Sequence, residues 1–173
     1  MVIRKMKLVN WRNFRKVEID FDDVTYIIGP NAAGKSNFLD VFRFLRDLAS
    51  PDGGGLQKAM SVRGGLSKVR CLAARQKTDI VIAMDLADDF GDAPLKWHYE
   101  LALGQQPSGK HKPIVIREVV KSLVDGKVVL QRPTPEDSAD KERLTQTALE
   151  QIASNGRFRE VSEFLADALY LHL

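Results

Sequence analysis

The 173-residue sequence contains a single cysteine, Cys71, and three well-separated histidines. One cysteine excludes an internal disulfide framework and a multi-cysteine zinc site, and His98, His111 and His172 follow no metal-ligand spacing. No run approaches the roughly 20 apolar residues that a membrane-spanning helix needs. The N-terminus also lacks the continuous apolar stretch of a secretory signal. These absences predict a cytoplasmic globular protein, with no membrane partner and with Cys71 as a small core residue.

Charge is distributed unevenly along a chain whose formal net charge is +3. Residues 1–75 hold 14 Lys and Arg against 7 Asp and Glu, whereas residues 76–173 hold 12 against 16. A basic first half is typical of a protein with an anionic partner, either a nucleotide phosphate or a nucleic acid. An ordinary solvated surface would give the same excess, so charge alone leaves these alternatives open.

Hydrophobic periodicity divides the chain into three parts, and the first of them is 1–49. Strand patterns at 2–9 and 16–21 are close enough in sequence to form a hairpin. The short apolar run 24–28 is typical of a fully buried strand. Residues 36–49 then carry apolar side chains at helical spacing, which predicts a helix with one broad apolar face.

The second part, 50–132, opens with a Pro- and Gly-rich stretch that predicts a loop as far as residue 65. Five strand patterns separated by turn-rich pieces then predict a mostly antiparallel sheet. Their ranges are 67–74, 78–86, 95–103, 113–124 and 127–132. Asp125-Gly126, between the last two, is typical of a two-residue hairpin turn.

The third part, 133–173, returns to helical composition. Thr134 has the features of an N-cap, with a proline next and an acidic residue three positions later, so a helix is expected over 135–154. A second helix is expected over 157–168, and 169–173 has the pattern of a starting strand. Together the three parts predict a mixed α/β (α+β) fold in a single lobe, 1–173, with no linker between independent domains.

One motif is specific enough to predict chemistry. The motif G-x-x-x-x-G-K-[ST] is matched at every fixed position by Gly29-Pro30-Asn31-Ala32-Ala33-Gly34-Lys35-Ser36. Its glycines let the backbone wrap closely around a phosphate chain, its N–H groups form an anion nest, and the following helix adds its positive end. We expect Lys35 to reach the β- and γ-phosphates of ATP and the Ser36 hydroxyl to ligate Mg²⁺.

The segment 8–45 resembles the N-terminus of the SMC-like and RecF-like branch of ABC-type ATPases, which includes the OLD-family nucleases. The likeness lies in the NWRNF turn at 10–14, in the hairpin leading directly into the motif, and in the form GPNAAGKSN. Asn31 and Asn37 occupy their usual places in that form, so Asn37 joins the expected phosphate-binding residues. Ala32 stands where many members have glycine.

The resemblance implies that two ATP molecules are held between two ATPase heads. Each loop is then completed by a Leu-Ser-Gly-Gly signature from the other head, and hydrolysis needs an Asp-Glu pair after a later apolar strand. The chain contains neither element. Asp85 follows an apolar run, but its place inside the antiparallel pattern favours a structural role. We therefore expect the N-terminal half of a head, in DNA repair or phage defence. It would hydrolyse ATP only when completed by the C-terminal half and a second head.

Further residues are candidates by resemblance. Arg12 and Asn13 are candidate nucleotide contacts, with a solvated hairpin corner as the alternative, and Gln76 is a candidate Mg²⁺ contact. For Trp11 and Phe14 we expect positions in the hairpin core, with stacking on adenine as the alternative. A basic surface that could contact DNA phosphates would comprise Arg43, Arg46, Arg63, Lys68 and Arg70.

Two other functions compete with this interpretation. A small complete P-loop kinase would fit the length, but the chain lacks the parallel βα alternation that such enzymes need. A regulatory lobe that binds nucleotide without hydrolysing it is the third alternative.

Overall fold

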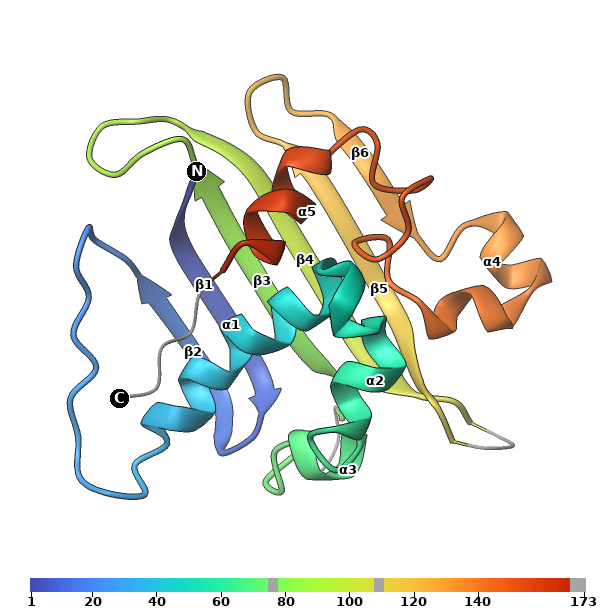
Figure 1. Cartoon of the computed structure of the whole chain (residues 1–173), viewed down its shortest axis with the longest axis horizontal. Coiled ribbons are helices and arrows are strands. Elements are labelled where there is room, and N and C mark those ends of the chain that lie inside the picture. The colour runs from blue at the N-terminus through green and yellow to red at the C-terminus, as the bar shows by residue number, and fades with distance from the viewer. Residues whose placement is uncertain (75–77, 108–110, 169–173) are drawn as a thin grey trace.

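The computed structural model describes residues 1–74, 78–107 and 111–168. Within them six strands form one antiparallel sheet in the spatial order β2-β1-β3-β4-β5-β6 (Figure 1). The strands are β1 (Val2–Trp11), β2 (Phe14–Asp20), β3 (Ile80–Ala87), β4 (Leu95–Gln105), β5 (Pro113–Ser122) and β6 (Val128–Arg132). The α-helices are α1 (Lys35–Ala49), α2 (Gly55–Ser61), α3 (Leu66–Val69), α4 (Pro135–Ala139) and α5 (Arg159–Ala166), and the 3-10 helices are η1 (Pro51–Gly53) and η2 (Lys141–Thr145).

The sheet has one buried face because its strands alternate apolar and polar side chains. Along β4, Trp97, Tyr99 and Leu101 are buried, while the intervening side chains are only partly covered. Helices α1, α2 and α5 lie over this apolar face (Figure 1). The core side chains of α1 are Phe38, Val41, Phe44, Leu45 and Leu48, which share one hydrophobic cluster with the strands.

The predicted hairpin and antiparallel sheet are confirmed. β1 and β2 pair antiparallel from Lys5↔Asp20 to Trp11↔Phe14, which leaves a turn of two residues. The four strands predicted between 78 and 132 appear as β3 to β6, with ends shifted by at most two residues. Thr134 caps α4 in a capping box with Asp137, as the sequence indicates.

The prediction of a buried strand at 24–28 is wrong. The segment forms no strand, and Tyr26 and Ile28 are 82% and 91% exposed. An apolar strand is buried only when other strands flank it, and the six described strands form a sheet that does not include this segment. Figure 1 shows it as an extended stretch that leaves β2 and returns to α1 away from the sheet.

Two predictions for the stretch between α1 and β3 are also wrong. The expected loop over 50–65 contains η1 and α2. Leu56, Ala59 and Met60, which follow the Gly-rich stretch, have helical spacing and are buried, so this part forms a helix. The expected strand at 67–74 begins instead with the short helix α3, whose Leu66 and Val69 are buried one turn apart.

The long helix expected over 135–154 is interrupted. α4 ends at Ala139, its C-cap Asp140 has an extended backbone, and η2 and a series of turns follow. The two-residue turn expected at Asp125-Gly126 is longer, since the Ser122 N–H donates to the Lys127 carbonyl at 2.9 Å. The helix expected at 157–168 is confirmed as α5, and the strand expected at 169–173 lies outside the described residues.

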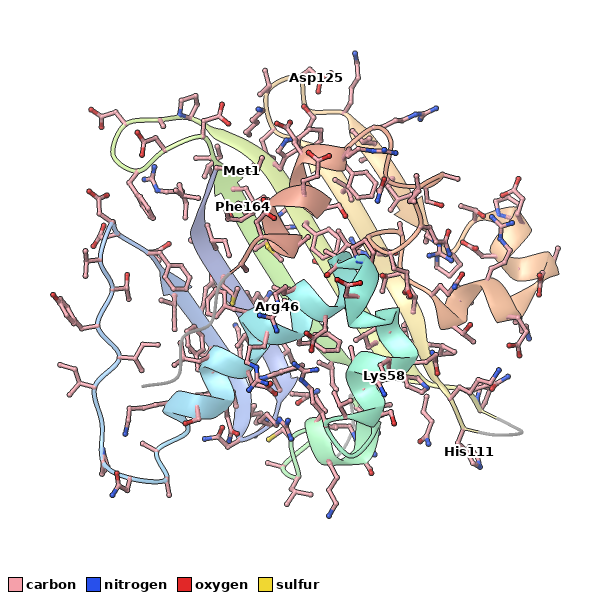
Figure 2. All side chains as sticks on the ribbon, in the orientation of Figure 1. Met1, Arg46, Lys58, His111, Asp125 and Phe164 are labelled. Carbon is pink, nitrogen blue, oxygen red and sulfur yellow. The ribbon has the colours of Figure 1, made fainter. Side chains whose placement is uncertain are left out.

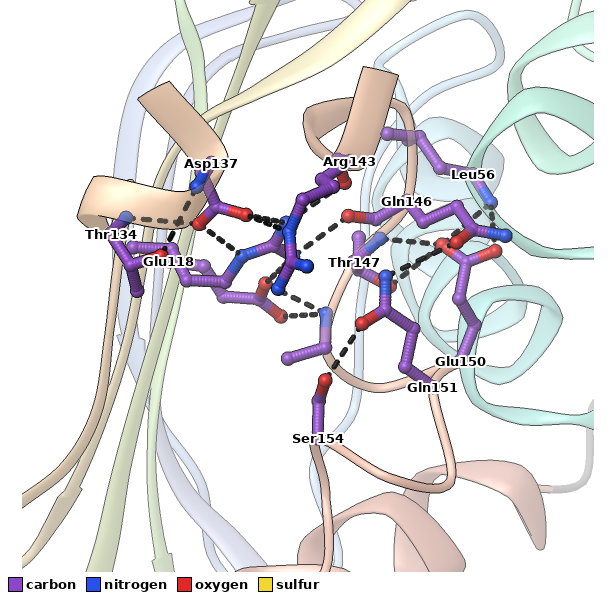
Figure 3. Close-up of polar contacts among 12 residues, drawn as sticks. Leu56, Glu118, Thr134, Asp137, Arg143, Gln146, Thr147, Glu150, Gln151 and Ser154 are labelled. Carbon is purple, nitrogen blue, oxygen red and sulfur yellow. Dashed lines mark hydrogen bonds and ion pairs between the residues drawn. The ribbon is translucent and has the colours of Figure 1, made fainter. Parts of the chain in front are cut away.

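A buried ionic cluster explains why the chain after α4 turns back instead of continuing as a helix (Figure 3). Arg132 on β6 makes two 3.0 Å contacts to Asp137 and one of 3.4 Å to Glu118. Glu118 also accepts the Ala148 N–H at 2.8 Å and the Tyr99 hydroxyl at 3.0 Å. Burial raises the pKa of Glu118. Burial would also raise the pKa of Asp137, but hydrogen bonds from Arg132 and from the Thr134 N–H hold it below its usual value.

Candidate functional site

The loop that connects the exposed 24–28 segment to α1 surrounds a small hollow. Residues 31–37 line this hollow, whose volume is about 300 Å³. α1 begins at Lys35, and no side chain caps its first turn. The first N–H groups of a helix have no partner within the helix, so this turn offers donors and the positive end of the helix dipole to an anion.

Lys35 folds back over the loop. Its ammonium group donates to the Gly29 carbonyl at 2.7 Å and to the Pro30 carbonyl at 2.9 Å. An ammonium group has three donors, so these two contacts shape the loop and leave one donor for an anion in the hollow. The Ala33 N–H also donates to the Pro30 carbonyl, at 3.2 Å, and closes a turn.

Gly34 has two reasons to be glycine. Its φ of 98° lies in the left-handed region, which L side chains disfavour. A Cβ at this position would also lie 2.2 Å from the side-chain nitrogen of Asn13 on the β1–β2 turn. The close approach of this turn to the loop therefore depends on the missing side chain.

Ala32 is also in the left-handed region, with φ of 65°, although it has a Cβ. Such a conformation costs a non-glycine residue on the order of 1–2 kcal/mol. The glycine that many members of the resembling family have at this position would avoid that cost.

Replacing Ala32 by glycine is therefore expected to stabilise the chain by about 0.5–1 kcal/mol, after allowance for the greater entropy of unfolded glycine. Ala33→Gly is the matched control, because the φ of Ala33 is not positive and the same change there should destabilise the chain. Urea unfolding of both variants measures the difference. A loss of stability in Ala32→Gly as large as that in Ala33→Gly would contradict the strain argument.

The structure separates the two candidate contacts of the β1–β2 turn. Asn13 lies against the loop, where its amide group donates to the Ala33 carbonyl at 3.4 Å. Arg12 instead forms an ion pair of 2.9 Å with Asp40 on α1. Trp11 is fully buried, which confirms its expected core position.

Arg63 is not part of an exposed basic surface. Its side chain is 5% exposed and lies between Asp40, at 3.1 Å, and Asp47, at 2.8 Å. Arg63, just after α2, thus joins two aspartates of α1, whose seven-residue spacing places them on one helix face.

The other residues of the expected basic surface are less enclosed. Arg46, labelled on α1 in Figure 2, lies 3.5 Å from Asp47. Arg43 and Lys68 are exposed, and Arg70 is partly covered. Gln76, the candidate Mg²⁺ contact, lies outside the described residues.

Asp85 lies on β3, between β1 and β4 in the middle of the sheet, and is not among the residues that line the hollow of the loop. It pairs in register with His98 of β4, and their side chains approach to 2.6 Å between Nδ1 and Oδ1. Lys5 and Glu100 line the same shallow polar hollow on the sheet face away from the core. This pairing supports the structural role expected for Asp85.

Among the described residues, no helix has the length and apolar character to cross a membrane.

The chain belongs to the AAA ATPase domain family, whose match covers residues 1–114. It is distantly and partially related to three kinds of curated protein. A DNA replication and repair protein RecF from Oceanobacillus iheyensis is 44% identical over 55 residues, 30% of this chain and 15% of that protein. Endonuclease GajA from Bacillus cereus is 45% identical over 47 residues, which are 27% of this chain and 8% of that protein. Chromosome partition protein Smc from Bacillus subtilis is 26% identical over 106 residues, which are 57% of this chain and 8% of that protein. The matches thus span less than a quarter of the relatives' lengths.

Proposed function

We propose that the chain binds ATP with Mg²⁺ at residues 29–37, as the N-terminal lobe of an ATPase head. The observation that carries the proposal is the loop itself: Lys35 shapes it through the Gly29 and Pro30 carbonyls, and the uncapped first turn of α1 opens into the hollow. Such a nest of donors suits the β- and γ-phosphates. Ser36, which also lines the hollow, is the proposed Mg²⁺ ligand.

We further propose that a C-terminal half completes the head by covering the 24–28 segment. The exposed apolar side chains of residues 24–28 adjoin a groove of about 390 Å³, which is lined by Ile27, Phe38, Phe42 and Phe164. Figure 2 shows Phe164 beside Met1, at the start of β1, and both residues line this groove. Neighbouring exposed apolar side chains beside a groove favour an interaction site, and Tyr26 and Ile28 are such side chains. The all-antiparallel sheet of the described residues argues against the complete kinase.

Phosphate release separates these alternatives. A reacting water must be oriented by a carboxylate or glutamine, and the chain has no Asp-Glu pair. We expect turnover near background from the chain alone and an increase when a polypeptide with the C-terminal half is added. Steady turnover by the chain alone that survives Asp85→Ala and is lost in Lys35→Ala would instead favour a complete enzyme.

DNA repair or phage defence, a second head as partner, and DNA as ligand are proposals of the same kind. They rest on the family and on the names of the relatives. Binding through Arg43, Arg46 and Arg70 would be electrostatic, with a log–log salt slope of roughly −0.9 per neutralised phosphate.

Changing these three arginines to glutamate together is expected to abolish DNA binding in a filter or anisotropy assay. An Arg117→Glu variant, on β5, is the charge control and should bind as the unaltered chain does. A flat salt dependence, or full binding by the triple variant, would contradict DNA contact through this surface.

A further inference from the structure

The β1–β2 turn holds the Gly29–Ser36 loop and the start of α1 through one asparagine. The carbonyl oxygen of the Asn13 side chain accepts from the Asn37 amide at 3.0 Å, and its own amide donates to the Ala33 carbonyl at 3.4 Å. Asn13 therefore bridges the last part of the loop and the first turn of the helix. The bare Cα of Gly34 lies between these two contacts and makes room for it.

The turn that carries Asn13 is itself firmly anchored. The Trp11 indole donates to the Asn37 carbonyl at 2.7 Å and packs on Phe44, with ring centroids 5.2 Å apart. The Arg12 N–H donates to the Val69 carbonyl at 2.6 Å, in addition to the ion pair with Asp40. Asn13 therefore connects the loop to a turn that is fixed by the sheet and by helices α1 and α3.

Both polar groups of Asn13 have partners within the protein, so its side chain has a structural role before any nucleotide binds. Neither alanine nor aspartate can replace both contacts, because the first has no polar group and an ionised carboxylate cannot donate. On its opposite side the loop is held by Lys35. Removing Asn13 would leave the Ala33 carbonyl and the Asn37 side chain without this link, so residues 33–37 would be held less firmly and binding would have to order them.

We propose that Asn13 is a positioning residue that fixes Ala33 and Asn37 so that the first turn of α1 keeps its donors directed at a bound triphosphate. The inference rests on the proposed ATP function and deepens it. It assigns to the hairpin turn the preorganisation of the phosphate site. Asn37 is the partner through which Asn13 acts on the helix.

A double-mutant cycle on Mg²⁺–ATP affinity tests the coupling. Asn13→Ala and Asn37→Ala both remove the hydrogen bond between the two side chains, and the loss of this shared bond is expected to weaken binding about fivefold in each. Because the two side chains act through a shared contact, the double variant should bind within about twofold of the single variants. Gln131→Ala, at an exposed position of β6, removes an amide outside the loop and should bind as the unaltered chain does. Independent, multiplying losses would overturn the coupling.

Hydrogen exchange without nucleotide tests the positioning role separately from ATP binding. The amides of Ala33 and Phe38, which donate to Pro30 and Gly34, report the closed loop. We expect their exchange to accelerate about fivefold in Asn13→Ala. The unfolding midpoint of Asn13→Ala should equal that of Gln131→Ala. Unchanged exchange overturns the positioning role even if ATP binds. Failure of the unaltered chain to bind ATP overturns the proposed function instead, whatever the exchange rates.

Discussion

Replacing Lys35 by alanine is expected to weaken Mg²⁺–ATP binding at least tenfold, equivalent to about 1.4 kcal/mol. The change removes the cation that, in the proposed site, would face the phosphates. It also removes the two hydrogen bonds to Gly29 and Pro30, so the loop loses its closed form together with its charge. Titration calorimetry with a non-hydrolysable ATP analogue measures the loss.

Lys58→Ala is the matched control for this prediction. Lys58 is exposed on α2 (Figure 2), so the variant loses the same charge away from the loop and should bind as the unaltered chain does. Equal affinities for Lys35→Ala and Lys58→Ala would show that the ligand does not use the loop.

Replacing Arg132 by alanine is expected to destabilise the fold by about 3–5 kcal/mol, because it leaves the buried Glu118 carboxylate without a countercharge and Asp137 with only the exposed Arg143, at 3.2 Å. Glu118 and Asp137 are 0% and 1% exposed, and Arg132 contacts both of them and also the Gln146 carbonyl at 2.8 Å. Since these contacts hold the chain after β6 against the sheet, α4 and the following turns should detach first.

Urea unfolding measures that loss, with Arg117→Ala as the control. Arg117 forms an ion pair of 3.3 Å with Glu100, but its side chain is 59% exposed. Exposed pairs contribute little, so the control should lose no more than about 1 kcal/mol. Similar losses in the two variants would contradict the role assigned to the buried cluster.

The sequence predicted the parts of the fold that local patterns determine. The β1–β2 hairpin and the strands β3 to β6 follow from alternation, and Thr134 is recognisable as an N-cap from the proline that follows it and from Asp137. The apolar run 24–28 shows the limit of this reasoning. Its composition is that of a buried strand, but burial depends on neighbouring strands that composition cannot supply.

Short helices and ion-pair partners were harder to predict for a related reason. α3 has four residues, too few for a period of 3.6 to be recognised. Arg12 and Arg63 looked like surface cations because nothing local indicates that α1 brings Asp40 to both of them. The loop motif was recognisable because its chemistry is contained in eight consecutive residues. The role inferred for Asn13 required the structure, since it depends on how the hairpin turn packs against Gly34.

Amide chemical-shift mapping during a titration with ATP and Mg²⁺ tests the central claim most directly. If residues 29–37 form the phosphate site, the largest shifts should fall on the amides of this segment and of the adjacent Asn13. They should also disappear in Lys35→Ala. Shifts concentrated on the open face of the sheet around Asp85 and His98, or no shifts at millimolar ATP, would contradict it.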